Sequence, residues 1–115
     1  MDERIEFNDN SNGKLNCQFF PLIRLHTQIK NAVGSQKQIY LKGVYKGNAK
    51  ILTSRSVKLA DITDEMAMLN SGIDAESLRK RLKATLRHPS INWDMQLLDY
   101  LVLGYTKESR EPKLL

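Results

Sequence analysis

Residues 95–105 read MQLLDYLVLGY, and this stretch decides the fold class. Apolar side chains occupy both alternating sets of positions, which is typical of a β-strand that is covered on its two faces. Such a strand needs neighbouring strands and further elements packed over the sheet. The rest of the chain should therefore supply both strands and helices.

Two helices are predicted immediately before this strand. Thr63 is a good N-cap, acidic residues follow it in the first turn, and Gly72 ends the helix. Asp74 caps a second helix over residues 75–87, in which a leucine at every fourth position forms one apolar stripe. Pro89 then stops this helix.

The residues before the helices predict a β-hairpin and one earlier strand. Residues 38–45 (QIYLKGVY) and 49–59 (AKILTSRSVKL) have the composition of strands and flank turn-forming residues at 46–48. A strand over residues 15–22 and a short helix over residues 25–33 are expected upstream. This mixed order predicts an α+β fold, a compact barrel-like sheet with helices at its ends.

The length fits one domain, which we place over residues 14–107. Residues 1–13 are polar and are predicted to form a loose tail, and residues 108–115 a second one. No apolar run approaches the roughly 20 residues of a membrane span, and the first residues do not resemble a secretory signal. Because Cys17 is the only cysteine, we expect a reducing compartment, the cytoplasm, and no membrane association.

The net charge of +5 is distributed unevenly along the chain. Residues 10–60 hold nine Lys or Arg and no Asp or Glu, whereas residues 61–115 hold eight cations and nine anions. Cations without local acids attract phosphate groups. The asymmetry favours a polyanionic partner, and the alternative is an ordinary basic domain whose lysines are merely solvated.

Few residues suggest catalysis or metal binding. His26 and His88 have no metal-ligand spacing, so neither a metal nor a cofactor is expected. The chain has no Gly-x-Ser-x-Gly motif, and Cys17 is interpreted as a small core residue. By contrast, Tyr40 precedes Lys42 by two positions, and an aromatic ring beside an ammonium can stack a base while engaging its phosphate.

Several local strings resemble the ASCH domain family. Residues 57–67 (VKLADITDEMA), then Gly72 and the basic helix, are similar to the carboxy-terminal half of these domains. In the amino-terminal half, Gly34, Lys37 and the strand ending at Lys42 look like the family pattern, although Lys42 stands where arginine is usual and the family's "val-gly-asp" turn is missing or shortened.

The resemblance implies a PUA-like fold, which is a small β-barrel with flanking helices and a cleft beside the early helix. Members of the family are thought to bind RNA or modified nucleobases, and some hydrolyse N4-acetylcytidine with a Lys, a Thr and a Glu. Lys37 matches the family lysine, but Ile39 or Tyr40 holds the threonine position and residues 69–71 hold the glutamate position. The amidohydrolase activity is therefore disfavoured.

The sequence thus predicts a non-catalytic nucleic-acid-binding module with a basic cleft, with RNA as the expected partner. Lys37 and Lys42 are expected to contact phosphate, Tyr40 to stack a base, and Arg24 and Arg55 to add positive potential. One alternative is an enzyme on the same fold that acts on a modified nucleoside, as N4-acetylcytidine amidohydrolases do, or on RNA. The other is a protein-interaction domain of phage or mobile-element origin. Nucleic-acid binding also predicts that the nine early cations converge on one surface.

Overall fold

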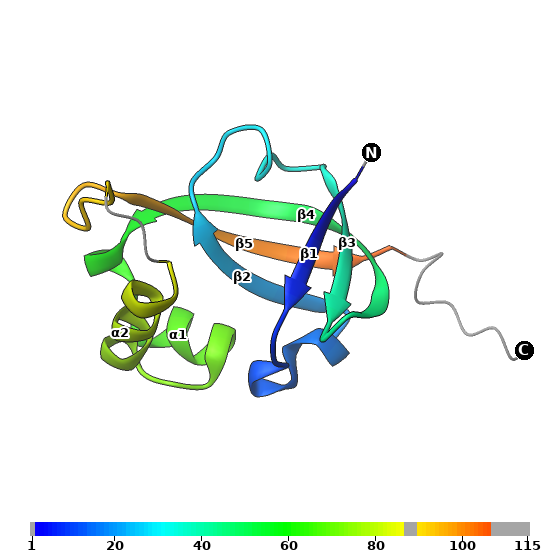
Figure 1. Cartoon of the computed structure of the whole chain (residues 1–115), viewed down its shortest axis with the longest axis horizontal. Coiled ribbons are helices and arrows are strands. Elements are labelled where there is room, and N and C mark those ends of the chain that lie inside the picture. Colours follow the sequence, from blue (N-terminus) through cyan, green and yellow to red (C-terminus); the bar gives the residue numbers. More distant parts are fainter. Residues whose placement is uncertain (1, 87–89, 107–115) are drawn as a thin grey trace, which may run out of the picture.

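The computed structural model describes residues 2–86 and 90–106. Five strands form one sheet in the spatial order β1-β3-β4-β5-β2, and the sheet curls into a half-barrel (Figure 1). The chain is therefore a small α+β domain with a barrel-like sheet, as expected. The strands are β1 (Glu3–Phe7), β2 (Phe19–Leu25), β3 (Gln36–Leu41), β4 (Val44–Lys58) and β5 (Leu97–Tyr105).

Helices α1 (Asp64–Ser71) and α2 (Ala75–Thr85) lie together at one end of the sheet (Figure 1). Two short 3-10 segments, η1 (Ser11–Asn16) and η2 (Leu59–Asp61), complete the elements. No helix in the described part of the chain is long and apolar enough to span a membrane.

The helix boundaries follow the predicted caps. The Thr63 side chain accepts a hydrogen bond from the Met66 amide at 3.1 Å, and Gly72 ends α1 with a φ of 73°. Asp74 accepts a hydrogen bond from the Ser77 amide at 2.9 Å at the start of α2. These three predictions are confirmed, whereas the predicted stop at Pro89 lies outside the described residues.

The core has two parts because the sheet is covered on both faces. The inner face of the half-barrel buries one cluster, and α1 and α2 bury a second one against one end of the outer face. In β5, Leu101 belongs to the inner cluster and Leu98 to the outer one, so the two-sided burial predicted for this strand is confirmed. The largest fully buried inner residues are Leu15, Phe20, Ile39, Ile51, Leu101 and Leu103.

The start of the chain corrects the prediction of a loose tail over residues 1–13. Glu3–Phe7 form β1, which pairs in parallel with β3 and adds an edge strand. Ile5 and Phe7 alternate toward the inner cluster, where Ile5 is buried and Phe7 is partly buried. Two apolar side chains are enough to hold β1 in the sheet because the strand also forms backbone hydrogen bonds with β3. Residues 108–115 lie outside the described part.

The helix predicted over residues 25–33 is absent. β2 continues to Leu25, and the chain then forms a turn-rich loop up to the start of β3. Ile29 is 88% exposed, so no apolar helix face is buried there. Instead, the buried Asn31 amide nitrogen donates to the Leu25 carbonyl oxygen at 3.1 Å and fixes the loop.

The predicted hairpin is present, but its turn lies earlier than expected. Lys42 and Gly43 connect β3 to β4 with φ values of 50° and 81°, which suit a two-residue hairpin turn. The predicted turn at residues 46–48 lies inside β4, beside the irregularity in the β3–β4 pairing. The first predicted strand is displaced as well, since η1 occupies part of residues 15–22 and β2 begins at Phe19.

Candidate functional site

The helices leave one end of the outer sheet face uncovered, and we call this region the open face. Along β3, the buried Lys37 and Ile39 alternate with Gln36, Gln38 and Tyr40, which point outward. The same alternation along β1 and β4 places further side chains on this face. The open face comprises Arg4, Gln36, Gln38, Tyr40, Tyr45, Asn48, Lys50, Leu52 and Phe19.

Arg4, Tyr40 and Tyr45 form a stack across three adjacent strands. The guanidinium carbon of Arg4 lies 3.7 Å from the centre of the Tyr40 ring. The Tyr40 and Tyr45 ring centres are 5.4 Å apart, and the ring planes are inclined by 59°. Tyr45 is 49% exposed, so part of the stack remains open to solvent. Flat, exposed groups of this kind are suited to stacking on nucleobases.

Hydrogen bonds hold parts of this stack in place. The Tyr45 hydroxyl donates to the side-chain oxygen of Asn48 at 2.7 Å. Arg4 donates to Glu6 at 3.2 Å, and the Glu6 carboxylate also accepts the Gly43 amide at 2.7 Å. The stack is thus fixed relative to the β3–β4 turn.

Beyond the tyrosines, the open face continues as polar side chains and ends in a small groove. Gln36 pairs with Lys50 across β3 and β4. A pocket of about 380 Å³ follows, lined by these two residues and by Phe19 and Leu52. A Cβ atom on Gly104 would lie 2.9 Å from Phe19 and 3.0 Å from Leu52, so the glycine allows both side chains to close over β5.

Of the five residues predicted to form the nucleic-acid site, Tyr40 and Lys42 lie at this end of the sheet. Lys42 is exposed in the β3–β4 turn, where its amide donates to the Phe7 carbonyl oxygen at 2.9 Å. The turn therefore places Lys42 at the same end of the sheet as the tyrosine stack.

Arg24 and Lys37 are brought together by the fold, but away from the open face. Arg24 lies 2.6 Å from a Glu3 carboxylate oxygen, and the Lys37 ammonium lies 3.0 Å from the other. The hydrogen bonds and charges of these two cations lower the pKa of Glu3 to about 2 against its partial burial, with the Arg24 hydrogen bond as the largest cause. Lys37 is only 3% exposed. Both cations are already engaged by a carboxylate.

Arg55 is separate from the other four predicted site residues. It lies farther along β4, and its guanidinium nitrogen is 3.7 Å from the Met66 sulfur on α1. The nine early cations do not converge on one surface. Lys14, Arg24 and Lys37 are engaged inside the domain, Lys50 belongs to the open face and Lys42 adjoins it, and Arg55 and Lys58 lie at the helix-covered end.

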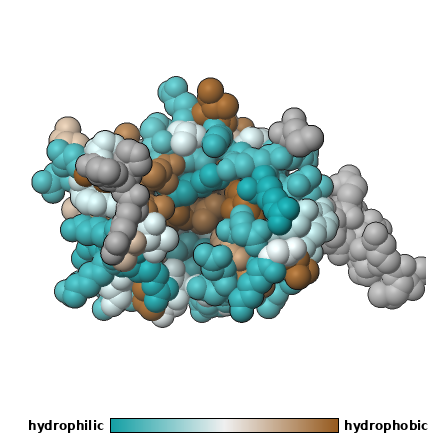
Figure 2. Space-filling model, viewed as in Figure 1, coloured by the Kyte–Doolittle hydropathy of each residue, from teal (hydrophilic) through white to brown (hydrophobic). Residues whose placement is uncertain are grey.

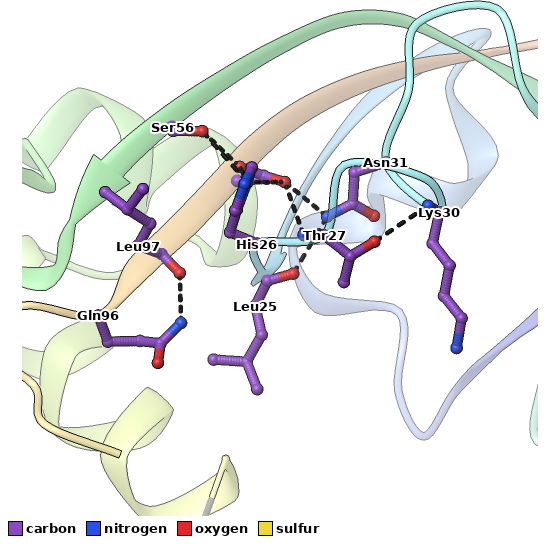
Figure 3. A network of polar contacts seen from close by, with 9 residues as sticks. Leu25, His26, Thr27, Lys30, Asn31, Ser56, Gln96 and Leu97 are labelled. Atoms are coloured by element: carbon purple, nitrogen blue, oxygen red, sulfur yellow. Dashed lines mark hydrogen bonds and ion pairs between the residues drawn. The ribbon is translucent and has the colours of Figure 1, made fainter. Parts of the chain in front are cut away.

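A second polar cluster is formed by His26, Asn31 and Ser56 around Asp99 (Figure 3). Asp99 is 1% exposed and accepts hydrogen bonds from Asn31 at 2.7 Å and from the Ser56 hydroxyl at 2.8 Å. His26 Nδ1 faces both carboxylate oxygens at 2.9 and 3.0 Å. Burial favours the neutral acid, but these hydrogen bonds outweigh it and hold the pKa of Asp99 below its ordinary value.

The Asp99 cluster is a structural anchor. The Ser56 hydroxyl donates directly to Asp99, and His26 faces both Ser56 and Asp99 with one ring nitrogen, Nδ1. A Ser–His–Asp relay needs a different ring nitrogen for each partner, so no relay is formed. Asp99 also accepts the Thr27 amide at 3.3 Å. The cluster thereby fastens the loop between β2 and β3 to β5.

Sequence reasoning missed Arg4 and Tyr45 as partners of Tyr40, and Glu3 as the partner of Lys37. The alternation of Arg4 and Glu6 with buried Ile5 was the signal that could have identified β1 as a strand. Comparison of the chain with protein-family models, curated proteins and solved structures finds no match.

Proposed function

We propose that the protein binds single-stranded nucleic acid on the open face, with RNA as the preferred partner. The observation that carries this proposal is the stack of Arg4, Tyr40 and Tyr45 across β1, β3 and β4. Proteins bind unpaired bases by stacking them on exposed aromatic rings and guanidinium planes. A sheet face with two adjoining tyrosines offers such a platform.

The surrounding side chains suit the rest of a nucleotide strand. Lys42 and Lys50 adjoin the platform and can neutralise phosphates, while Gln36 and Gln38 can hydrogen-bond to bases or to 2′-hydroxyl groups. Phe19, which is 60% exposed at the other end of the open face, offers a third ring. Stacking, rather than a dense positive field, therefore carries most of the affinity.

The curled sheet with helices at one end also supports a finer assignment of the fold. On the sequence resemblance we propose a PUA-like barrel of the ASCH type. This assignment and the binding proposal are independent, because the stack includes residues that the resemblance did not select.

Amidohydrolysis is the less favoured alternative. Glu3 provides a carboxylate beside Lys37, which the matching positions of the sequence lack. With a pKa of about 2, however, Glu3 is a weak proton acceptor near neutral pH. Its two cationic partners hold it in a structural ion pair.

The test is fluorescence anisotropy with labelled ribo- and deoxyribo-oligonucleotides of equal sequence at several salt concentrations. Tyr45→Ala is expected to weaken binding about tenfold, as loss of one stacked base would. Tyr45→Phe, which keeps the ring, should bind within about twofold of the original protein. Ile29→Ala is the matched control, because Ile29 is exposed outside the open face.

The salt dependence provides a second readout. Lys42→Gln should reduce the slope of log affinity against log salt by about 0.7, the value for one phosphate on a single strand, and Arg55→Gln should leave it unchanged. Absence of binding at low salt, or equal affinity of Tyr45→Ala and the original protein, would overturn the proposal. Tighter binding of the deoxyribo-oligonucleotide would overturn the preference for RNA.

A further inference from the structure

A pocket opens where the half-barrel is not closed, between the edge strands β1 and β2 and helix α2. Its volume is about 480 Å³, within the range of small-molecule sites. We call it the seam pocket. Figure 2 shows a hollow in the middle of the visible face, with hydrophobic residues on its floor and hydrophilic residues around it. The apolar lining includes Ile5, Leu22, Ile23, Leu78 and Leu82.

The three carboxylates of the seam pocket are already engaged by the protein. Glu3 holds Arg24 and Lys37, and Glu6 accepts the Gly43 amide and Arg4. Asp9 accepts the amide and the hydroxyl of Ser11. The pKa of each of the three is lowered, with hydrogen bonds as the leading cause, so all three are ionised and internally satisfied.

Positive charge exceeds negative charge around the seam pocket. Arg4, Arg24 and Arg81 line it, and two buried lysines lie directly behind it. One is Lys37, which forms an ion pair with Glu3. The other is Lys14, whose ammonium donates to the lining residue Asn70 at 2.8 Å. Among the residues that the structure describes, these five cations against three carboxylates leave an excess of two positive charges.

Arg81 is the cation best placed to meet a ligand. It is exposed on α2, lines the seam pocket and forms no hydrogen bond or ion pair with any residue that the structure describes, although its charge is one of the smaller causes that lower the pKa of Asp9. Ser71 and Thr85 also line the pocket. A guanidinium next to an apolar floor matches a ligand that has one apolar and one anionic end.

We propose that the seam pocket binds an amphipathic anion, with the apolar body on the leucine-rich floor and a carboxylate or phosphate head at Arg81. This site shares Arg4 with the open face, but its other residues differ from those of the nucleic-acid site proposed above. Tyr45 and Lys42 do not line the seam pocket, and Arg81 and Thr85 do not belong to the open face. Each proposal can therefore fail without the other.

The test uses four probes with the same eight-carbon chain: octanoate, octyl phosphate, octanamide and octylammonium. Binding to the full chain is measured by two-dimensional NMR and by calorimetry. One or both anions are expected to shift the amide signals of β1, β2 and α2, and to bind at least tenfold more tightly than octanamide. Octylammonium should bind more weakly still. Comparison of the affinities for octanoate and octyl phosphate distinguishes a carboxylate ligand from a phosphate ligand.

Matched variants locate the site. Arg81→Gln should remove the preference for the anions, whereas Lys80→Gln, at an exposed neighbour that does not line the pocket, should keep it. Thr85→Trp places a large ring at the exposed margin of the pocket and should abolish binding of every probe. Equal affinity for anion and cation, no shifts with either anion, or unchanged selectivity in Arg81→Gln would overturn the proposal.

Discussion

The carboxylate of Glu3 lies 3.0 Å from the ammonium of Lys37, although 34 residues separate them in the chain. Glu3 also holds Arg24, so a single carboxylate joins strands β1, β2 and β3. β1 and β2 are the two edges of the sheet. The ion pairs thus tie together the edges that backbone hydrogen bonds leave apart.

Replacement of this carboxylate should destabilise the fold in a pH-dependent manner. The pKa of Glu3 is lowered from 4.5 to about 2, so its contribution is complete above pH 4.5 and is lost as the pH falls toward 2. Glu3→Gln should lower the free energy of unfolding by about 2 kcal/mol at pH 7, allowing for partial screening by solvent. Urea unfolding between pH 2 and 7 measures this.

The same experiment has an internal control. The difference between the original protein and Glu3→Gln should shrink below pH 4.5, while Glu76→Gln, in an exposed pair with Lys80 at 3.9 Å, should change stability by less than about 0.5 kcal/mol. A difference that stays constant down to pH 2 would contradict the role assigned to Glu3.

Lys14 should make stability rise with pH above neutrality. Its burial lowers the pKa from 10.5 to about 8, so between these values the unfolded chain holds a proton that the folded protein has lost. Stability then increases as the pH rises. The free energy of unfolding of the original protein, relative to Lys14→Met, should grow by about 2 kcal/mol from pH 7.5 to 9.5. If the free energy of unfolding depended on pH in the same way in the two proteins, this prediction would be contradicted.

Asp99→Asn should release the loop between β2 and β3. The substitution removes the negative charge that His26, Asn31 and Ser56 face, at an expected cost of about 3 kcal/mol. Hydrogen exchange should accelerate at the Gly34 amide, which bonds to the Ile51 carbonyl oxygen at 2.7 Å. Asp94→Asn, at an exposed position, is the control.

Gly104→Ala should disturb the end of the open face. The added methyl would approach Phe19 to 2.9 Å, and the ring must move to relieve the contact. We expect a loss of about 1 kcal/mol, most of which Phe19→Ala should restore in the double variant. Chemical denaturation of the two single variants and the double variant measures this coupling. Additive effects would show that Phe19 does not restrict position 104.

Local signals in the sequence were sufficient for helices α1 and α2 and for strand β5, but they wrongly predicted a helix over residues 25–33. Caps at Thr63 and Asp74 act through hydrogen bonds within three residues, so their chemistry is visible in a short window. β5 carries its two-sided burial in its own composition. By contrast, β1 gains stability from β3 and from cations far along the chain, and no local window contains that information.

The candidate site was predictable only in part. Tyr40 and Lys42 share one strand end, so their proximity follows from spacing. The positions of Arg4 and Tyr45 relative to Tyr40 depend on strand pairing and on a hairpin turn two residues long, which the sequence suggested at a different place. Net charge could not show that Arg24 and Lys37 face a carboxylate.

The place of β5 in the sheet has a consequence for how the protein is made. Of the five strands that the structure describes, β5 leaves the ribosome last, yet it lies between β4 and β2 and supplies residues to both core clusters. Until residues 97–105 have been synthesised, β2 has no neighbour in the sheet and the inner side chains stay exposed. Folding of the sheet must therefore await the synthesis of β5, and products shortened before β5 should aggregate rather than form a partial domain.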